Sequence, residues 1–209
     1  MSKDEFFESW SAMHGGAEIA GIVRAWLTIS YWITRPLVIL RISPNLLSIL
    51  SIISAVAFLA FIESNWSVFF LVVSLLFDGI DGTVAILTNK SSRFGAVIDS
   101  VADRMVEAFW AYGFYLLGAP WQIVIAAWTA AFIQEYLRAR AGGLGVSEVI
   151  KVTWAERPIR ATLIFIPLIA GLFGMELFAV AAWIWFAMQT SSALYLMNSL
   201  RLRLRQSQR

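Results

Sequence analysis

The sequence contains no cysteine, and its one histidine is His14. Disulfide bonds and thiolate chemistry are therefore excluded, and we expect no zinc site built from cysteine and histidine. Charged residues are also scarce, since they make up only 14% of the 209 residues whereas 59% are hydrophobic. This composition is unlike that of a soluble domain and predicts an integral membrane protein. Residues 1–14 lack the basic start of a cleavable signal peptide, so we expect internal apolar segments to direct insertion.

Long apolar segments follow one another from residue 45 onward, separated by short polar joints. A bilayer requires about 20 residues of helix, so six segments are predicted to span it: 45–62, 66–88, 94–117, 120–140, 158–174 and 177–199. We therefore predict an all-α integral membrane protein with six transmembrane helices. A single domain is expected over 1–209, with an N-terminal segment at 1–44, a core at 45–200 and a basic tail at 201–209.

The N-terminal segment differs from the core because charges interrupt its apolar pattern. Residues 1–14 mix aromatic with acidic side chains, and residues 17–41 contain Arg24, Arg35 and Pro36 within an apolar run. We predict an N-terminal amphipathic helix lying in the membrane interface, with its tryptophans at the level of the lipid headgroups. The alternative is a first transmembrane helix whose arginines extend to the surface.

Lysine and arginine are unevenly distributed between the two ends of these segments. The joints near 63–65, 118–120 and 174–176 contain neither, whereas the opposite ends and the tail hold Lys90, Arg93, Arg138, Arg140, Lys151, Arg157, Arg160, Arg201, Arg203, Arg205 and Arg209. By the positive-inside rule we expect a multi-pass protein of the cell (plasma) membrane with both termini in the cytoplasm. Anchoring to anionic lipid is a simpler role for most of the tail arginines.

Small residues recur at four-residue spacing at Ala126, Ala127, Ala130 and Ala131. This spacing favours close helix packing in membranes. The packing occurs either across a homodimer or within one chain.

Four aspartates interrupt an otherwise apolar stretch: Asp78, Asp81, Asp99 and Asp103. The residues of each pair are three or four apart and so share a helix face. Two consecutive helices joined by a short loop are antiparallel, which places Asp81 about 12 Å, Asp99 about 9 Å and Asp103 about 15 Å from the loop. Each carboxylate at membrane depth costs about 2.5–3.5 kcal/mol, so a compensating cation is expected. Clustered oxygen ligands favour Mg²⁺ or Mn²⁺, and four carboxylates suffice for two ions.

Gly82 and Gly95 adjoin these aspartates and leave room for a phosphate-bearing ligand. The alternative for the aspartates is a polar network between two helices, in which a carboxylate pairs with Arg104, or a cation or proton pathway in which Glu107 joins a proton relay. Arginines form a second polar set, because Arg138 and Arg140 end one segment while Arg157 and Arg160 begin the next. Guanidinium groups bind phosphate bidentately, so an anion pocket is predicted. Positive-inside placement explains the same arginines without a ligand.

Residues 78–103 resemble the signature of the CDP-alcohol phosphotransferase (CDP-alcohol phosphatidyltransferase) family. That signature reads Asp-x-x-Asp-Gly-x-x-Ala-Arg, eight residues, Gly, three residues, Asp, three residues, Asp, and the chain matches seven of its eight fixed letters. The resemblance implies the six-helix fold of the family over most of the chain. It also implies that Asp78, Asp81 and Asp99 hold two Mg²⁺ ions, and that Asp103 completes the second site and is the general base. Donor-binding positions implied by it are Ser43, Pro44, Asn45, Leu46, Gly82 and Ser92.

One letter departs from the signature, because Ile86 stands where the family has arginine. In the family this arginine is taken to help hold the nucleotide donor. Either Lys90 or Arg93 supplies the missing charge, or the chain is a degenerate, non-catalytic member.

Two further segments, Tyr136–Ala141 and Glu156–Arg160, resemble the phosphatidylinositol phosphate synthase branch, with Arg138 where that branch usually has lysine. The resemblance implies transfer of a phosphatidyl group from CDP-diacylglycerol to inositol phosphate, which yields phosphatidylinositol phosphate and CMP. Arg138, Arg140, Arg157 and Arg160 are then expected to bind the acceptor phosphate. Glycerol 3-phosphate is the alternative acceptor, as in phosphatidylglycerophosphate synthases.

Overall fold

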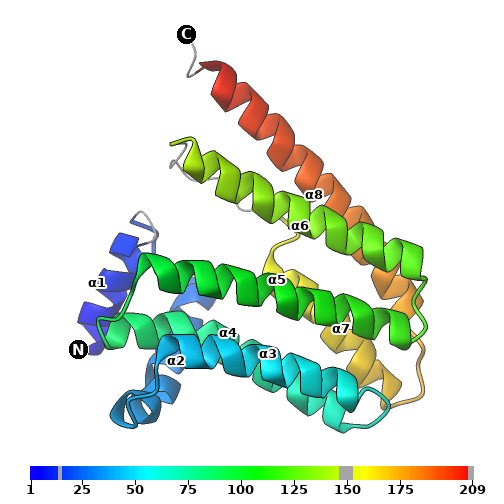
Figure 1. Cartoon of the computed structure of the whole chain (residues 1–209), viewed down its shortest axis with the longest axis horizontal. Coiled ribbons are helices and arrows are strands. Elements are labelled where there is room, and N and C mark those ends of the chain that lie inside the picture. The colour runs from blue at the N-terminus through cyan, green and yellow to red at the C-terminus, as the bar shows by residue number, and fades with distance from the viewer. Residues whose placement is uncertain (14–15, 146–152, 207–209) are drawn as a thin grey trace. The chain divides into compact units, whose positions relative to one another are not determined.

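Figure 1 shows the computed structural model of the chain, which describes residues 1–13, 16–145 and 153–206. The described residues form helices without any strand, which confirms the all-α prediction. The helices are α1 Lys3–Met13, α2 Gly21–Ile39, α3 Pro44–Ala60, α4 Trp66–Leu87, α5 Arg93–Leu116, α6 Trp121–Gly143, α7 Arg157–Gly171 and α8 Phe178–Gln206. His14, Lys151 and Arg209 lie outside the described residues.

Helices α3 to α7 coincide with the predicted spans to within a few residues, whereas α8 continues into the basic tail. Of the described helices, α4 alone is both long and apolar enough to cross a membrane. A second span would result if the pair Val23–Ile39 and Pro44–Ala60, bent by 109°, formed one broken span. Helices α3 and α7 have only 17 and 15 residues, fewer than the roughly 20 that a bilayer requires. The six-span count therefore stays a prediction.

The chain forms two compact units. The first consists of Met1–Ala57 and Phe69–Val106, and the second of Phe58–Val68 and Glu107–Arg209. Helices α3, α4 and α5 each contribute residues to both units. The single domain over 1–209 stays a prediction.

Two apolar clusters hold the first unit together. Helix α1 packs on α2 through Phe6, which is fully buried against Leu27 and Tyr31. Leu47 of α3 packs against Ile80 and Val84 of α4. The predicted amphipathic N-terminal segment thus forms two helices that pack on each other, while Trp26, Ile29 and Trp32 of α2 stay exposed. Its place at the membrane interface stays a prediction.

The second unit is built on α6, which packs along α8, and on α7, which also packs on α8. The Phe58 ring lies close to the backbone of α5 at Gly113, where a Cβ atom would be only 2.5 Å from the ring. This contact therefore requires glycine at position 113. Ala127 and Ala131 of α6 are fully buried within the chain. Packing within one chain therefore accounts for the spacing of Ala127 and Ala131, whereas Ala126 and Ala130 are partly exposed. The homodimer stays a prediction.

Candidate functional site

Three of the four predicted aspartates meet in the first unit. Asp78 of α4 and Asp99 and Asp103 of α5 are half-buried, and each offers a carboxylate oxygen within 4.8 Å of the other two. Like charges this close disfavour one another unless a cation lies among them. The Nη2 atom of Arg104 lies 3.6 Å from Asp103 Oδ2 and offsets part of the charge. An all-oxygen donor set of this kind fits a hard divalent cation such as Mg²⁺ or Mn²⁺.

Asp81 is held differently from the other three aspartates. Its side chain is buried, its Oδ2 accepts a 2.6 Å hydrogen bond from Ser48 Oγ, and its Oδ1 accepts one of 2.6 Å from the Gly82 backbone N–H. Ser48 lies on α3, so Asp81 links α3 to α4. The group within 4.8 Å does not include Asp81. Its role as a metal ligand stays a prediction, whereas its contact with Ser48 was not anticipated.

Two of the predicted donor-binding serines begin helices. Ser43 Oγ accepts a hydrogen bond from the Leu46 N–H at 3.3 Å, with Pro44 at the first position of α3. Ser92 Oγ likewise accepts one from the Gly95 N–H at 2.9 Å, at the start of α5. Such N-caps contribute about 1 kcal/mol each. Helix capping therefore explains both serines locally, and donor binding by them stays a prediction.

Two further donor positions, Asn45 and Gly82, are described by the space around glycines. A Cβ atom on Gly95 would lie 3.0 Å from Ser92 Oγ and 3.5 Å from Asn45 Oδ1, so the start of α5 lies beside the start of α3. A Cβ atom on Gly82 would meet nothing within 4 Å. The structure thus brings Asn45, Ser92 and Gly95 together, and it leaves open space beside the glycine that follows Asp81.

Ile86, which stands at the arginine position of the signature, is a core residue of the first unit. It is 5% exposed and belongs to the cluster of Phe6, Leu27 and Tyr31. Its side chain therefore serves the packing of α1 and α2 onto α4. An arginine at this position would place a charge in an apolar cluster.

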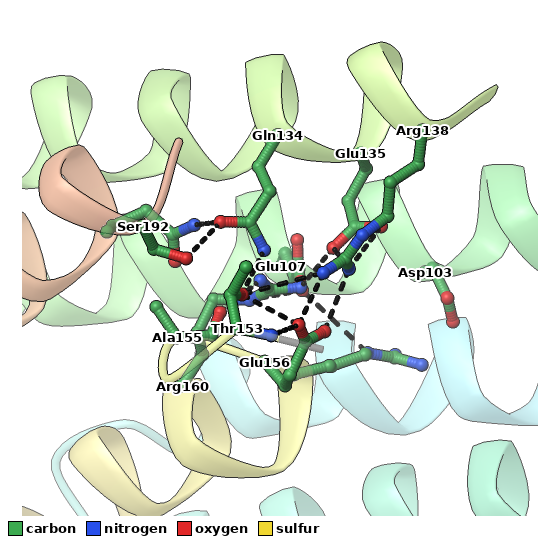
Figure 2. Close-up of polar contacts among 12 residues, drawn as sticks. Asp103, Glu107, Gln134, Glu135, Arg138, Thr153, Ala155, Glu156, Arg160 and Ser192 are labelled. Atoms are coloured by element: carbon green, nitrogen blue, oxygen red, sulfur yellow. Dashed lines mark hydrogen bonds and ion pairs between the residues drawn. The ribbon is translucent and has the colours of Figure 1, made fainter. Parts of the chain in front are cut away.

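The predicted phosphate-binding arginines lie in the second unit, where carboxylates engage most of them (Figure 2). Arg160 is 2% exposed. Its Nε and Nη2 atoms donate to Glu107 Oε1 at 2.9 and 2.6 Å, and its Nη1 donates to the Ala155 carbonyl at 2.8 Å. Nη2 also lies 3.3 Å from Glu135 Oε1. Most donors of this guanidinium are therefore used within the protein.

Arg138 makes a bidentate pair with Glu156 and also donates to Glu135 Oε1 at 3.2 Å. The backbone N–H and the hydroxyl of Thr153 both donate to Glu156 Oε1 at 2.7 Å. Burial raises the pKa of Glu156, but the hydrogen bonds from Arg138 and Thr153 outweigh burial and lower the pKa below its ordinary value.

Arg157 completes this group, because its Nε lies 3.9 Å from Glu107 Oε1 and its guanidinium lies over the Trp110 ring at 5.6 Å. We call the six residues Glu107, Glu135, Arg138, Glu156, Arg157 and Arg160 the ionic network; its formal charge is 3 − 3 = 0. Arg140 is not part of it, because a residue two positions beyond Arg138 faces another side of the helix. Arg140 instead lines a groove with α8.

Sequence reasoning gave no role to Glu135 and considered Glu107 only as a member of a proton relay. One local signal was available, since Glu135 precedes Arg138 by three residues, the spacing of a helical ion pair. The pair of Glu107 with Arg160 joins residues 53 positions apart and has no such signal.

Comparison with known proteins supports the family resemblance that the aspartates of residues 78–103 indicated. Residues 41–193, more than half of the chain, match the family model described as CDP-alcohol phosphatidyltransferase. The archaetidylinositol phosphate synthase of Pyrococcus horikoshii is 33% identical over 129 residues, which cover 59% of this chain and 66% of that protein. The protein of the same name from Aeropyrum pernix is 33% identical over 141 residues, covering 65% and 72%.

A bacterial protein is similar over a longer range. The phosphatidylinositol phosphate synthase of Corynebacterium glutamicum is 29% identical over 159 residues, covering 70% of this chain and 71% of that protein. The chain spans just under two thirds of the Pyrococcus protein. With its aspartates in the matched frame, the chain belongs to the CDP-alcohol phosphatidyltransferase family, whose members are membrane-integral transferases.

Proposed function

We propose that the protein transfers a phosphatidyl group from CDP-diacylglycerol to inositol phosphate and thereby makes phosphatidylinositol phosphate and CMP in phospholipid biosynthesis. The observation that carries the proposal is the meeting of Asp78, Asp99 and Asp103 within 4.8 Å, in the aspartate frame of the family. The names of the similar archaeal and bacterial proteins support inositol phosphate as the acceptor. We further propose that the protein is a homodimer of the cell membrane with both termini in the cytoplasm.

The carboxylate cluster would hold one or two Mg²⁺ ions, with Asp81 as a further ligand. When bound, the ions would neutralise the pyrophosphate of the donor and stabilise the departing CMP. Asp78 and Asp99 would position the ions. Ser48 would fix the orientation of Asp81, since it donates to Asp81 Oδ2. The open space beside Gly82 would admit the donor phosphates.

Asp103 would act as the general base on the acceptor hydroxyl. A carboxylate oxygen of Asp103 would accept the hydroxyl proton while the oxygen bonds to the phosphorus of the phosphatidyl group. The bond between that phosphorus and the oxygen of CMP breaks, and CMP leaves. The Nη2 atom of Arg104, 3.6 Å from Asp103 Oδ2, would help to orient this carboxylate.

The acceptor phosphate would bind to arginines, and the structure suggests an order among them. Arg138 is only half-buried, so a phosphate could reach it. Because its guanidinium is already paired with Glu156, the phosphate would have to displace that carboxylate. Arg157 lies at the edge of the ionic network, over Trp110. Arg160 is buried and bonded on most of its donors, so it would act mainly by holding α7 in place. Arg140 would act from outside the network.

The proposal is tested by CMP release from CDP-diacylglycerol in proteoliposomes. Inositol phosphate, glycerol 3-phosphate and no acceptor are compared, each with Mg²⁺, with Mn²⁺ and with a chelator. We expect release only with inositol phosphate and a divalent ion. Equal release with glycerol 3-phosphate alone would replace the acceptor and keep the reaction class. Release in the presence of excess chelator would remove the metal from the mechanism.

A non-catalytic member is the second candidate, and the burial of Ile86 at the signature arginine favours it. Ile86→Arg should not restore activity, because the charge would enter the cluster of Phe6 and Tyr31 and destabilise it by about 2 kcal/mol or more. Ile86→Val is the control and should cost about 0.5–1.5 kcal/mol. A large gain of CMP release in Ile86→Arg, with an unchanged melting temperature, would show that a missing donor contact had limited the wild-type protein.

A further inference from the structure

A buried glutamine of α6, Gln134, joins the ionic network to the core of the second unit. Its side chain is fully buried. Its Oε1 accepts hydrogen bonds from Gln189 Nε2 at 2.9 Å and from Ser192 Oγ at 2.6 Å, both on α8. Its Nε2 donates to Thr153 Oγ1 at 3.2 Å, as Figure 2 shows. Because two donors from α8 hold the oxygen of this amide, its NH₂ group is directed at Thr153.

The hydroxyl group of Thr153 passes this order on to Glu156. Its oxygen accepts from Gln134, and its proton is donated to Glu156 Oε1 at 2.7 Å. The backbone N–H of Thr153 donates to the same carboxylate oxygen, also at 2.7 Å. A line of donors thus runs from the buried amide of Gln134 through Thr153 to the half-buried carboxylate of Glu156.

The segment that contains Thr153 is bonded to α7 and α8 as well as to α6. Trp154 Nε1 donates to Ser191 Oγ of α8 at 3.1 Å. The carbonyl of Ala155 accepts from Arg160 Nη1 of α7 at 2.8 Å. Contacts with three helices therefore set where the two donors of Thr153 lie.

Glu156 Oε1 is shared between Thr153 and Arg138. Arg138 Nη2 donates to this oxygen, and Arg138 Nη1 donates to Glu156 Oε2 at 2.8 Å. A phosphate that takes the guanidinium of Arg138 must displace Glu156 from it. A half-buried carboxylate left without donors would be costly, especially since it is charged. The two donors of Thr153 remain on Glu156 after the displacement, so they make the pair of Arg138 and Glu156 exchangeable.

We propose that Thr153, directed by Gln134, is a positioning residue that keeps Glu156 in place while the acceptor phosphate exchanges with this carboxylate on Arg138. The proposal rests on the proposed function, since it takes Arg138 as a ligand of the acceptor phosphate. Thr153 and Gln134 act through Glu156 and contribute no atom to the reaction.

The test measures CMP release by the full chain in proteoliposomes with Mg²⁺ and CDP-diacylglycerol while the concentration of inositol phosphate is varied. Thr153→Val keeps the shape of the side chain and the backbone N–H but removes the hydroxyl donor. Glu156 then depends more on Arg138, so the KM for inositol phosphate should rise about 3- to 10-fold, the effect of part or all of one hydrogen bond to a charged group. The kcat and the KM for CDP-diacylglycerol should change little.

Two further variants separate the hydroxyl from other effects of substitution. Thr153→Ser keeps the hydroxyl and should restore a KM close to that of the wild-type protein. Thr162→Val is the matched control, because it removes a hydroxyl from an exposed threonine of α7 that donates only to its own helix, at the Pro158 carbonyl. It should leave the KM for inositol phosphate unchanged.

An unchanged or lowered KM for inositol phosphate in Thr153→Val would overturn the proposal, and so would a loss of kcat without any rise in KM. If Thr153→Val does not fold, Glu156→Gln gives the second test. Its neutral amide competes less for Arg138, so the KM for inositol phosphate should fall, and a rise would overturn the proposal. Wild-type protein that releases no CMP with any phosphorylated acceptor would overturn the proposed function as well, whereas an active wild-type protein with unresponsive variants would overturn this proposal alone.

Discussion

The aspartate cluster of the first unit and the ionic network of the second each gather three carboxylates, but their counterions differ. Asp78, Asp99 and Asp103 lie within 4.8 Å of one another, with Arg104 in contact with one of them. The three glutamates of the ionic network are instead matched by three arginines. The aspartate cluster is a donor set that fits a divalent cation from solution, whereas the ionic network carries its cations in the chain.

Of the variants that test this comparison, Asp103→Asn should have the largest effect, and the effect is on CMP release. If Asp103 is the general base, CMP release should fall by about 10²–10⁴-fold, because the amide cannot accept the proton. Melting temperature should change little, since Asp103 is half-buried. Asp4→Asn, which changes an exposed residue of α1, is the control and should retain activity. Full activity of Asp103→Asn would remove the proposed role.

The next largest effect concerns the buried ion pair of the ionic network. Glu107→Gln leaves the Arg160 guanidinium buried without its main counterion, which should cost about 3–5 kcal/mol of stability. Replacing both residues, by Glu107→Gln with Arg160→Met, should recover most of that loss, since no buried charge remains. Thermal melting in detergent measures both variants. A double variant no more stable than Glu107→Gln would contradict the pairing.

Metal binding distinguishes the two regions directly, because only the aspartate cluster is expected to bind Mg²⁺. Mg²⁺ at 100 times its dissociation constant should stabilise the folded protein by about 2.7 kcal/mol, and a chelator should reverse this. The shift should vanish in Asp78→Asn with Asp99→Asn but persist in Glu107→Gln. Differential scanning fluorimetry with and without Mg²⁺ is the measurement. The same shift in the aspartate variant would place the ion elsewhere.

The smallest effect is a pH dependence in the ionic network. Because the folded-state pKa of Glu156 is lowered, its contribution to stability is present above the ordinary glutamate pKa and is lost as the pH falls through the lowered value. Wild-type protein should therefore lose stability on acidification below about pH 4.5. Glu156→Gln should be less stable at neutral pH and should show a shallower acid dependence. Melting curves at several pH values would reveal identical slopes if Glu156 made no contribution.

Local patterns predicted much of the fold. The apolar runs placed α3 to α7 to within a few residues, because helix periodicity and polar joints are properties of short segments. Ser43 and Ser92 lie just before the predicted segments 45–62 and 94–117, and each caps the helix that follows. The membrane topology could not be checked in this way, because only α4 is long and apolar enough by itself among the described helices.

The sequence by itself determined the metal-site candidate, because spacings of three and four residues place the two aspartates of each helix on one face of that helix. It also determined that Ile86 departs from the family signature. Only the tertiary structure decided that Asp81 turns to Ser48 and that Ile86 packs beneath α1. It likewise paired Arg138 with Glu156 and placed Arg140 beside residues of α8. These outcomes depend on which distant segments pack together, and helical spacing carries no information about a partner many residues away.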